Sequence, residues 1–425
     1  MDDQVDEVAG GEEAVVLGLE DDRDDDLADD DGGLRGAFER WWTDVRAGQL
    51  GSLPIIIGLI IIAIVFQSQN DRFLTASNFV NLIVQSAAFA TIAMGIVFVL
   101  LLGEIDLSVG YVSGVAGVIA AVLLIPDGNQ TSTRIAIFLA LLSGVGIGTL
   151  HGLIITKIGI PSFVVTLAGL IAWNGVVLLL IGSRGTVVLQ NSFLIGLAND
   201  FLPESTSWML WLLAVLIFAG TQLNEVRVRR KADLGHDPFA VIGLRVAALA
   251  IALGAAVYVA NQDRGIPYLF LLVGFFLLFW GFVLGRTRFG RYVYAVGGNA
   301  EAARRAGIHV DRIRIAVFAI SGTMAALGGM ILASRLSSVD TNAGGGSILL
   351  YSIAAAVIGG TSLFGGVGHI KSAILGALVI ASIDNGLGLL GLGSGEKFVI
   401  TGGVLLLAVT VDSLSRRRLA QSGRA

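Results

Sequence analysis

Several residues of this chain with polar or aromatic side chains stand in or beside long apolar runs, where they could contact a solute that crosses a membrane. They are Glu104, Asp106, Ser108, Trp173, Asn174, Asp384 and Asn385. Polar groups are costly to place in a membrane, so each is a functional candidate by default. Carboxylates and amides exchange hydrogen bonds with hydroxyl groups, and an indole ring can cover an apolar C–H face. The set therefore indicates a path for a neutral polyol such as a sugar.

Some of these residues also have a purely structural interpretation. Asp106 with Ser108 could cap the start of the span that follows them. Asp384 with Asn385 could cap a broken helix in the same way. For Asp384 and Asn174, a structural role and a role in lining the path are equally compatible with the sequence.

No catalytic chemistry is indicated. The sequence has no nucleophile–base arrangement and no GxxxxGK phosphate loop followed by Ser or Thr, so we expect no nucleotide hydrolysis by this chain. The four histidines are scattered without ligand spacing, and the lack of cysteine excludes thiol catalysis. We therefore expect a chain that is not an enzyme, with no catalytic residue, metal site or cofactor of its own and no nucleic-acid partner.

The composition is that of a membrane protein, with 55% hydrophobic residues, 14% charged residues and a mean hydropathy of +0.81. A helix needs about 20 apolar residues to cross a hydrocarbon core. The apolar runs lack the alternation of barrel strands. We therefore predict an all-α polytopic membrane protein with about 12 transmembrane helices, within a range of 10–14. The predicted spans centre on residues 51–67, 79–102, 108–125, 135–158, 162–182, 208–223, 241–260, 267–285, 313–334, 348–363, 370–390 and 397–413.

The amino-terminal residues differ sharply from the rest of the chain. Residues 1–31 contain 15 Asp or Glu and one Arg, although the whole chain carries a formal charge of only −5. This stretch cannot bury a core and lacks the basic and apolar regions of a signal peptide. We predict a disordered acidic tail over 1–33, which serves solvation or partner binding, and an amphipathic interfacial lead-in over 34–50. The membrane domain is predicted over 51–418 and a C-terminal tail over 419–425.

Basic residues set the predicted orientation. With the amino terminus in the cytoplasm, 21 Lys and Arg fall on the cytoplasmic side and 6 on the other side. An excess of positive charge marks the cytoplasmic loops of membrane proteins. Both termini are therefore predicted to be cytoplasmic, and so is the basic segment 286–314.

Two glycine patterns predict departures from ordinary helix geometry. Gly144, Gly148 and Gly152 recur at four-residue spacing, which predicts close helix packing. The glycine pairs 359–360 and 365–366 predict a break in a helix, near the solute path. Residues 191–207 could form an external loop with a short helix or part of a re-entrant segment.

The basic segment 286–314 is the main place where a soluble partner could bind. Asn299 is a good N-cap for a short helix over residues 300–306, and Gly307 suits the position just after that helix. Arg304 and Arg305 would project from it. A short capped helix parallel to the membrane fits a groove on a partner. A plain surface loop that satisfies the positive-inside rule is equally compatible with the residues.

Three segments of the chain resemble ABC-importer permeases for monosaccharides, the ribose, xylose and galactose group. They are LTASNFVNLIVQSAAFATIAMGIVFVLLLGEIDLSVG, GRYVYAVGGNAEAARRAGI and SIAAAVIGGTSLFGGVGHIKSAILGALVIASIDNGL. The similarity covers about residues 50–418. GEIDLSVG, the long region 183–266 and ASIDNGL resemble the xylose-type branch. Glu301-Ala302-Ala303 followed by Gly307 has the EAA…G spacing of the loop by which such permeases dock on their ATPase.

The resemblance implies a permease in a bacterial cytoplasmic membrane, surrounded by lipid and present as a homodimer. It implies an ABC ATPase subunit that holds ATP and Mg²⁺, and an extracytoplasmic sugar-binding protein. The ATPase-coupling residues that it implies are Gly298, Asn299, Glu301, Ala302, Ala303, Arg304, Arg305 and Gly307. Two features depart from the pattern: the Ile-x-Leu-Pro that follows EAA…G in another importer class is missing, and the acidic tail lies outside the family pattern.

Two other functions remain open from the sequence. One is a secondary sugar transporter of the major facilitator type, because residues 286–291 look like the DRxGRR loop of that family. The Asp of that motif is missing, however, and the segment does not lie between the second and third spans. The other is a membrane scaffold without transport, which a central convergence of the polar residues would argue against.

Overall fold

The computed structural model describes residue 36 and residues 53–126, 131–232 and 238–421. The predicted acidic tail over 1–33, nearly all of the predicted lead-in over 34–50 and the end of the predicted C-terminal tail lie outside the described residues. The boundaries of these parts stay predictions.

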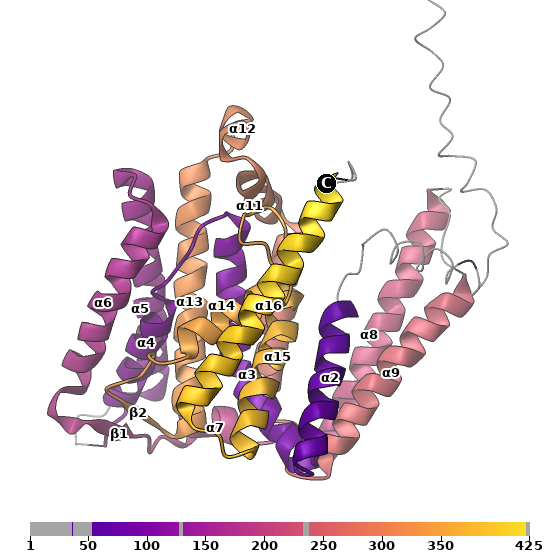
Figure 1. Ribbon diagram of the computed structural model, residues 1–425, viewed down its shortest axis with the longest axis horizontal. Helices are drawn as coiled ribbons and strands as arrows, with labels where there is room; N and C mark the ends of the chain where they lie inside the picture. The colour runs from indigo at the N-terminus through magenta and orange to yellow at the C-terminus, as the bar shows by residue number, and fades with distance from the viewer. Residues whose placement is uncertain (1–35, 37–52, 127–130, 233–237, 422–425) are drawn as a thin grey trace, which may run out of the picture. The chain divides into compact units, whose positions relative to one another are not determined.

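Each of the twelve predicted spans coincides with a helix (Figure 1). In the part of the chain that the structure describes, eight helical stretches are long and apolar enough to cross a membrane. They are α3 (Ala76–Leu101), α5 (Thr133–Leu153) with its π-helical extension η2 (Ile154–Ile158), α6 (Ser162–Ile181), α8 (Glu204–Lys231), α9 (Phe239–Asn261), α10 (Tyr268–Arg286), α13 (Val310–Leu336) and α15 (Ile370–Leu389). The other four predicted spans correspond to α2 (Leu53–Gln69), α4 (Val109–Leu123), α14 (Ile348–Ile358) and α16 (Ser394–Gln421). The chain is therefore an all-α polytopic membrane protein, as predicted.

Short elements connect these helices. Residues 191–207 contain α7 (Ser192–Asn199), a short helix that is compatible with both an external loop and a re-entrant segment. Strands β1 (Thr186–Val188) and β2 (Ser338–Asp340) pair antiparallel, with Val187 opposite Val339. The predicted basic segment holds α11 (Arg288–Gly298) and α12 (Ala300–Arg305).

The chain divides into two compact units. In the smaller unit, α8 and α9 contact each other within residues 209–254, where Trp211 Nε1 donates a hydrogen bond of 2.9 Å to the carbonyl oxygen of Ala250. The larger unit comprises residues 50–208 and 255–425, and all the sites described below lie within it.

Helix α13 is the central helix of the larger unit and packs along α3, α4 and α5. Its most apolar 18-residue window is 72% buried, against 28% for α6. Helices that are apolar on every side form the interior of a membrane protein when they are buried, and face lipid when they are exposed. The core therefore lies around α13 and α3, and α6 presents apolar side chains outward.

Glycines bring α5 into close contact with α13. A Cβ atom at Gly144, Gly148 or Gly152 would collide with α13, at Gly322, Phe318 and Ile315 respectively. The four-residue spacing of these glycines therefore serves close helix packing, which confirms the prediction.

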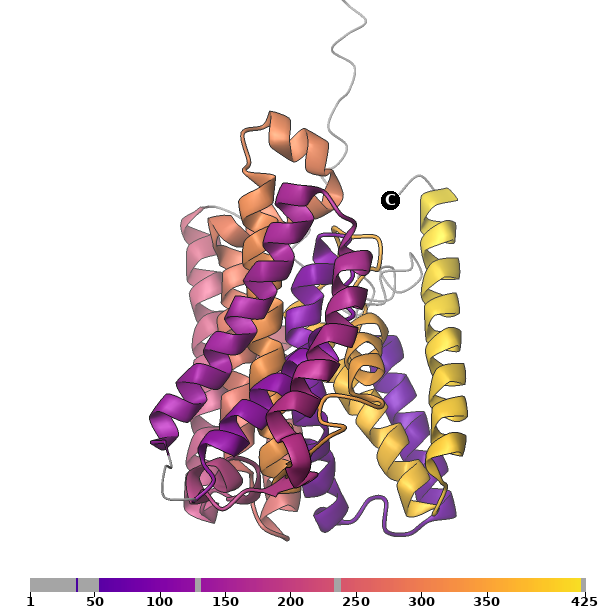
Figure 2. The same ribbon diagram turned by 90° about the vertical axis from the view of Figure 1, so that its left-hand side faces the viewer.

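The two ends of the larger unit carry different elements. Figure 1 and Figure 2 show α12 projecting at one end, and Figure 1 shows β2 and α7 at the opposite end. The C-terminal end of α16 lies at the same end as α12 (Figure 1). This arrangement agrees with the prediction that the C-terminus and the basic segment share the cytoplasmic side.

Candidate functional site

The basic segment 286–314, called the coupling segment below, begins with an amphipathic helix. The Thr287 side chain accepts a hydrogen bond of 3.3 Å from the Gly290 amide and so caps α11. Helix α11 buries Val293 and Val296, which lie three residues apart, and exposes Arg288 on the other face. Because one face packs on the unit and the other is basic, α11 holds the chain at the surface just before α12.

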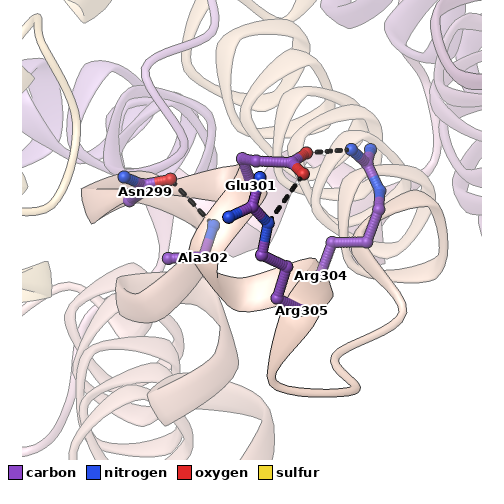
Figure 3. A network of polar contacts seen from close by, with 5 residues as sticks. All are labelled: Asn299, Glu301, Ala302, Arg304 and Arg305. Atoms are coloured by element: carbon purple, nitrogen blue, oxygen red, sulfur yellow. Dashed lines mark hydrogen bonds and ion pairs between the residues drawn. The ribbon is translucent and has the colours of Figure 1, made fainter.

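Helix α12 is closed at both ends, as the sequence predicts. Asn299 Oδ1 accepts a hydrogen bond of 2.9 Å from the Ala302 amide (Figure 3). At the other end Gly307 has a φ of +85°, its amide donates to Arg304 O at 3.0 Å, and the Ile308 amide donates to Ala303 O at 3.0 Å. This pair of bonds is the Schellman arrangement, which favours glycine at the left-handed position. The six residues of α12 therefore form a defined helix.

The outer face of α12 carries paired charges. Glu301 accepts hydrogen bonds from Arg304 Nη1 at 3.0 Å and Arg305 Nε at 3.2 Å (Figure 3). All three side chains are more than half exposed, whereas Ala303 is buried against the core. Exposed ion pairs add little to stability, about 0.5 kcal/mol each. These two contacts therefore contribute little to the stability of the fold.

Glu104, one of the predicted path residues, lies near the same end of the unit and forms an ion pair there. Its Oε1 lies 3.1 Å from Nε of Arg314, four residues into α13. The two side chains are only 14% and 28% exposed. The ion pair therefore connects the loop after α3 to the beginning of α13.

Asp106 and Ser108 belong to a buried polar network that joins four parts of the fold. Asp106 Oδ1 accepts hydrogen bonds from the Ser108 amide at 3.0 Å and the Ser108 hydroxyl at 2.6 Å. Asp106 Oδ2 accepts from the hydroxyl of Ser321 on α13 at 3.0 Å. Ser108 Oγ lies 3.3 Å from His151 Nδ1 on α5, and Trp173 Nε1 on α6 lies 3.1 Å from His151 Nε2.

The donor and acceptor groups around His151 determine which of its ring nitrogens carries the hydrogen. The indole N–H of Trp173 can only donate, so His151 Nε2 accepts and Nδ1 carries the hydrogen. Nδ1 then donates to Ser108 Oγ, and the Ser108 hydroxyl donates to Asp106. Every polar group in this network has a partner, which is the condition for burying them. The roles of His151 and Ser321 could not be predicted from the sequence, because their partners lie 43 and 215 positions away.

A cavity of about 370 Å³ is lined in part by β2. Strand β2 lies at the end of the unit opposite α12 (Figure 1). Its walls come from α3, α4, the last turns of α13, β2, the loop 342–347, α14, α15 and α16. Backbone at Gly114, Gly117 and Gly329 forms part of one wall, and apolar surface makes up the larger part of the lining. The polar side chains that line it include Ser113, Arg335, Asp340, Asn342, Tyr351 and Asp384. The volume is in the range of cavities that hold small molecules.

Asp384 is the predicted path residue that lines this cavity. The Tyr351 hydroxyl donates to its Oδ1 at 3.3 Å, and Lys397 Nζ on α16 lies 3.7 Å from the same atom. Helix α15 runs without interruption through Asp384, so the interpretation of this residue as the cap of a broken helix is wrong. The Oδ1 atom of the neighbouring Asn385 is buried without a hydrogen-bond partner among the described residues.

The structure thus separates the predicted path residues into distinct places. Glu104 lies near the coupling segment, whereas Asp106, Ser108 and Trp173 share the buried network. Asn174 is half-buried on α6 and does not line the cavity. The helix break predicted near the path lies over residues 359–369, against the coupling segment. For every predicted residue, contact with a solute stays a prediction.

Comparison with known proteins assigns the chain to a family. A family model described as "Branched-chain amino acid transport system / permease component" matches residues 78–410. The xylose transport system permease protein XylH of Escherichia coli (strain K12) is 39% identical over 382 residues, which cover 89% of this chain and 95% of that protein. XylH of Haemophilus influenzae (strain Rd) is 34% identical, with 87% and 98% covered. The ribose import permease protein RbsC of Escherichia coli (strain K12) is 31% identical, with 84% and 92% covered.

The chain therefore belongs to this family of transport permeases. The bacterial relatives and the apolar helices make it a multi-pass protein of the bacterial inner membrane. No solved structure matches the chain.

Proposed function

We propose that this chain is the membrane permease of an ABC importer for a pentose sugar, with xylose as the first candidate. The two relatives named for xylose transport are 39% and 34% identical to it, and the relative named for ribose import is 31% identical. Nothing in the family match favours the alternative of a major facilitator transporter.

An ATPase subunit docks on α12 and supplies the energy. The observation that carries this proposal is a short helix, capped at both ends, that projects from the unit between two membrane helices and exposes a charged face (Figures 1 and 3). A preformed helix of this kind fits a groove on a partner with little loss of entropy on binding. ATP and Mg²⁺ belong to that subunit, and this chain acts as a transport subunit without a nucleotide site.

The sugar passes through the cavity at the opposite end. Asp384, Arg335 and Asn342 offer acceptors and donors for hydroxyl groups, and the Tyr351 ring offers a face for C–H groups. The charges of Asp340 and Asp384 are offset by those of Arg335 and Lys397, which suits a neutral ligand. An extracytoplasmic binding protein delivers the sugar at this end, and a second copy of the chain completes the permease.

The test is to purify the tagged chain from its native membrane in mild detergent and to identify the proteins that accompany it. We expect a P-loop ATPase at near-equal stoichiometry. A chain that emerges without an ATPase, and that still carries xylose into vesicles in the absence of ATP, would show a secondary transporter.

A further inference from the structure

The loop between α14 and α15, residues 359–369, carries an unusually exposed apolar side chain. Phe364 is 86% exposed, more than any other large hydrophobic residue in the described part of the chain, and Val367 is 54% exposed. Leu179 has a similar exposure, but it lies on α6, which is long enough to span a membrane and face lipid. Phe364 lies in a connecting loop, so its exposure needs another explanation.

Backbone hydrogen bonds hold this loop in one shape. The Ser362 amide donates to Val367 O at 2.8 Å, and the Phe364 amide donates to Ser362 Oγ at 3.1 Å. Gly365 and Gly366 turn the chain with φ angles of +89° and +72°, which glycine adopts without strain. Phe364 is therefore exposed on a turn with a defined, hydrogen-bonded conformation.

The same loop is fixed to the coupling segment. The Tyr294 hydroxyl on α11 donates to Gly368 O at 2.7 Å. Burial raises the pKa of Tyr294, so this hydroxyl stays protonated and able to donate. A Cβ atom at Gly366 would lie 3.4 Å from the Cα of Gly298, the residue just before the N-cap of α12. The loop that carries Phe364 therefore packs, through Gly366, against the residue that precedes the N-cap of α12.

The position of the loop favours a protein partner over lipid. The Gly366 amide donates to Leu101 O at 2.9 Å, so the loop covers the C-terminal end of α3. The apolar window of α3 is 83% buried, the highest value among the described spans. The loop therefore lies over the interior of the unit at its α12 end and not over the lipid-facing helices.

We propose that Phe364 and Val367 form a second contact surface for the ATPase subunit, next to α12. This proposal rests on the proposed function, in which that subunit docks on α12. A subunit that covers α12 comes within reach of the loop, because Gly366 of the loop packs closely against Gly298, next to α12. Burial of an aromatic side chain in the centre of an interface is a common source of binding energy.

Photo-crosslinking in the full chain, in its native membrane, tests the proposal. The crosslinking amino acid p-benzoylphenylalanine is placed at position 364 in one variant and at position 302, on the exposed face of α12, in a second. We expect an adduct with the ATPase from both positions. An adduct from position 302 alone, with only lipid, a second copy of this chain or nothing at position 364, would overturn the second surface and leave the proposed function intact. No ATPase adduct from either position would count against both.

A matched pair of substitutions gives an independent readout. Phe364→Asp is expected to lower the amount of ATPase that co-purifies by about tenfold, the effect of losing one aromatic anchor. Phe193→Asp is the control, because Phe193 is 63% exposed on α7 at the opposite end. Equal ATPase recovery with the two variants, at equal levels of the chain in the membrane, would contradict the proposal.

Discussion

Glu104 and Arg314 form a half-buried ion pair of 3.1 Å that joins the loop before α4 to the first turns of α13. Arg314 lies on the helix that directly follows α12, and the far end of α13 reaches the cavity at Arg335. The loop that holds Glu104 leads into α4, which lines the same cavity with Ser113 and Gly117. The pair thus connects the helix that follows α12 to the loop that leads into a wall of the cavity.

Reversal of either charge of this pair is expected to impair transport. Glu104→Arg or Arg314→Glu leaves two like charges in a poorly solvated place, at a cost of about 2 kcal/mol, somewhat below the cost for a fully buried pair. The combined variant restores opposite charges, so xylose uptake by intact cells should recover in part. If the combined variant were no better than the single variants, the pair would have no role in coupling.

Charge reversal on α12 is expected to abolish uptake. Glu301→Lys puts a third positive charge beside Arg304 and Arg305, which breaks two contacts and disturbs the docking face. The control is Glu225→Lys, because Glu225 is also 57% exposed and also pairs with an arginine four residues later. We expect loss of ATPase co-purification for the first variant only. Normal co-purification with Glu301→Lys would remove α12 from the docking surface.

The left-handed turn after α12 gives a second, conformational test of the coupling segment. Gly307→Val places a β-branched residue at φ +85°, which costs about 2 kcal/mol and opens the C-terminal end of α12. Gly307→Asn should be tolerated, because asparagine adopts this conformation more readily. Uptake should therefore fall strongly for valine and little for asparagine. A similar loss of uptake with both variants would indicate that any side chain at position 307 impairs transport, whether or not it fits the turn.

Asp384 is expected to act on the sugar rather than on the ATPase. Asp384→Ala removes the acceptor of Tyr351 and the partner of Lys397, so xylose uptake should fall about tenfold or more while ATPase co-purification stays unchanged. Asp263→Ala is the control, since Asp263 forms an ion pair with Arg264, away from the cavity lining. Unchanged uptake kinetics with Asp384→Ala would return Asp384 to a structural role.

The buried network should matter chiefly for stability. Asp106→Ala leaves the Ser108 and Ser321 hydroxyls without their acceptor, at a cost of about 3 kcal/mol. Trp173→Phe removes one donor to His151, at a cost of about 1 kcal/mol. Thermal unfolding in detergent should show a clearly larger loss for the aspartate variant. Equal unfolding temperatures for the two variants would contradict the hydrogen bonds described here.

The helices and the coupling segment were predictable because their signals are local. A run of about 20 apolar residues marks a span wherever it occurs. The N-cap Asn299 and the C-terminal Gly307 lie within nine positions of each other, so the sequence could indicate a short helix between them, although a plain surface loop was equally compatible. The four-residue spacing of Gly144, Gly148 and Gly152 is local in the same sense.

The grouping of the polar residues was not predictable, because it depends on contacts between distant helices. Asp106 was recognised as exceptional, but its partner Ser321 lies on α13 and is one of many serines in the chain. Arg335 lines the cavity with Asp384, and nothing in the sequence around it indicates this position. Sequence pattern thus identifies costly polar groups, and only the packing of α13 against its neighbours shows which of them meet.

The most direct test of the central claim is uptake of labelled xylose by vesicles that contain this chain, its ATPase and its binding protein. Uptake is measured with and without ATP on the side of the membrane where the ATPase lies. We predict uptake only with ATP and with the ATPase present, and none when the chain carries Glu301→Lys. Uptake by the chain alone, without ATP, would contradict the account of an ATP-driven permease coupled through α12.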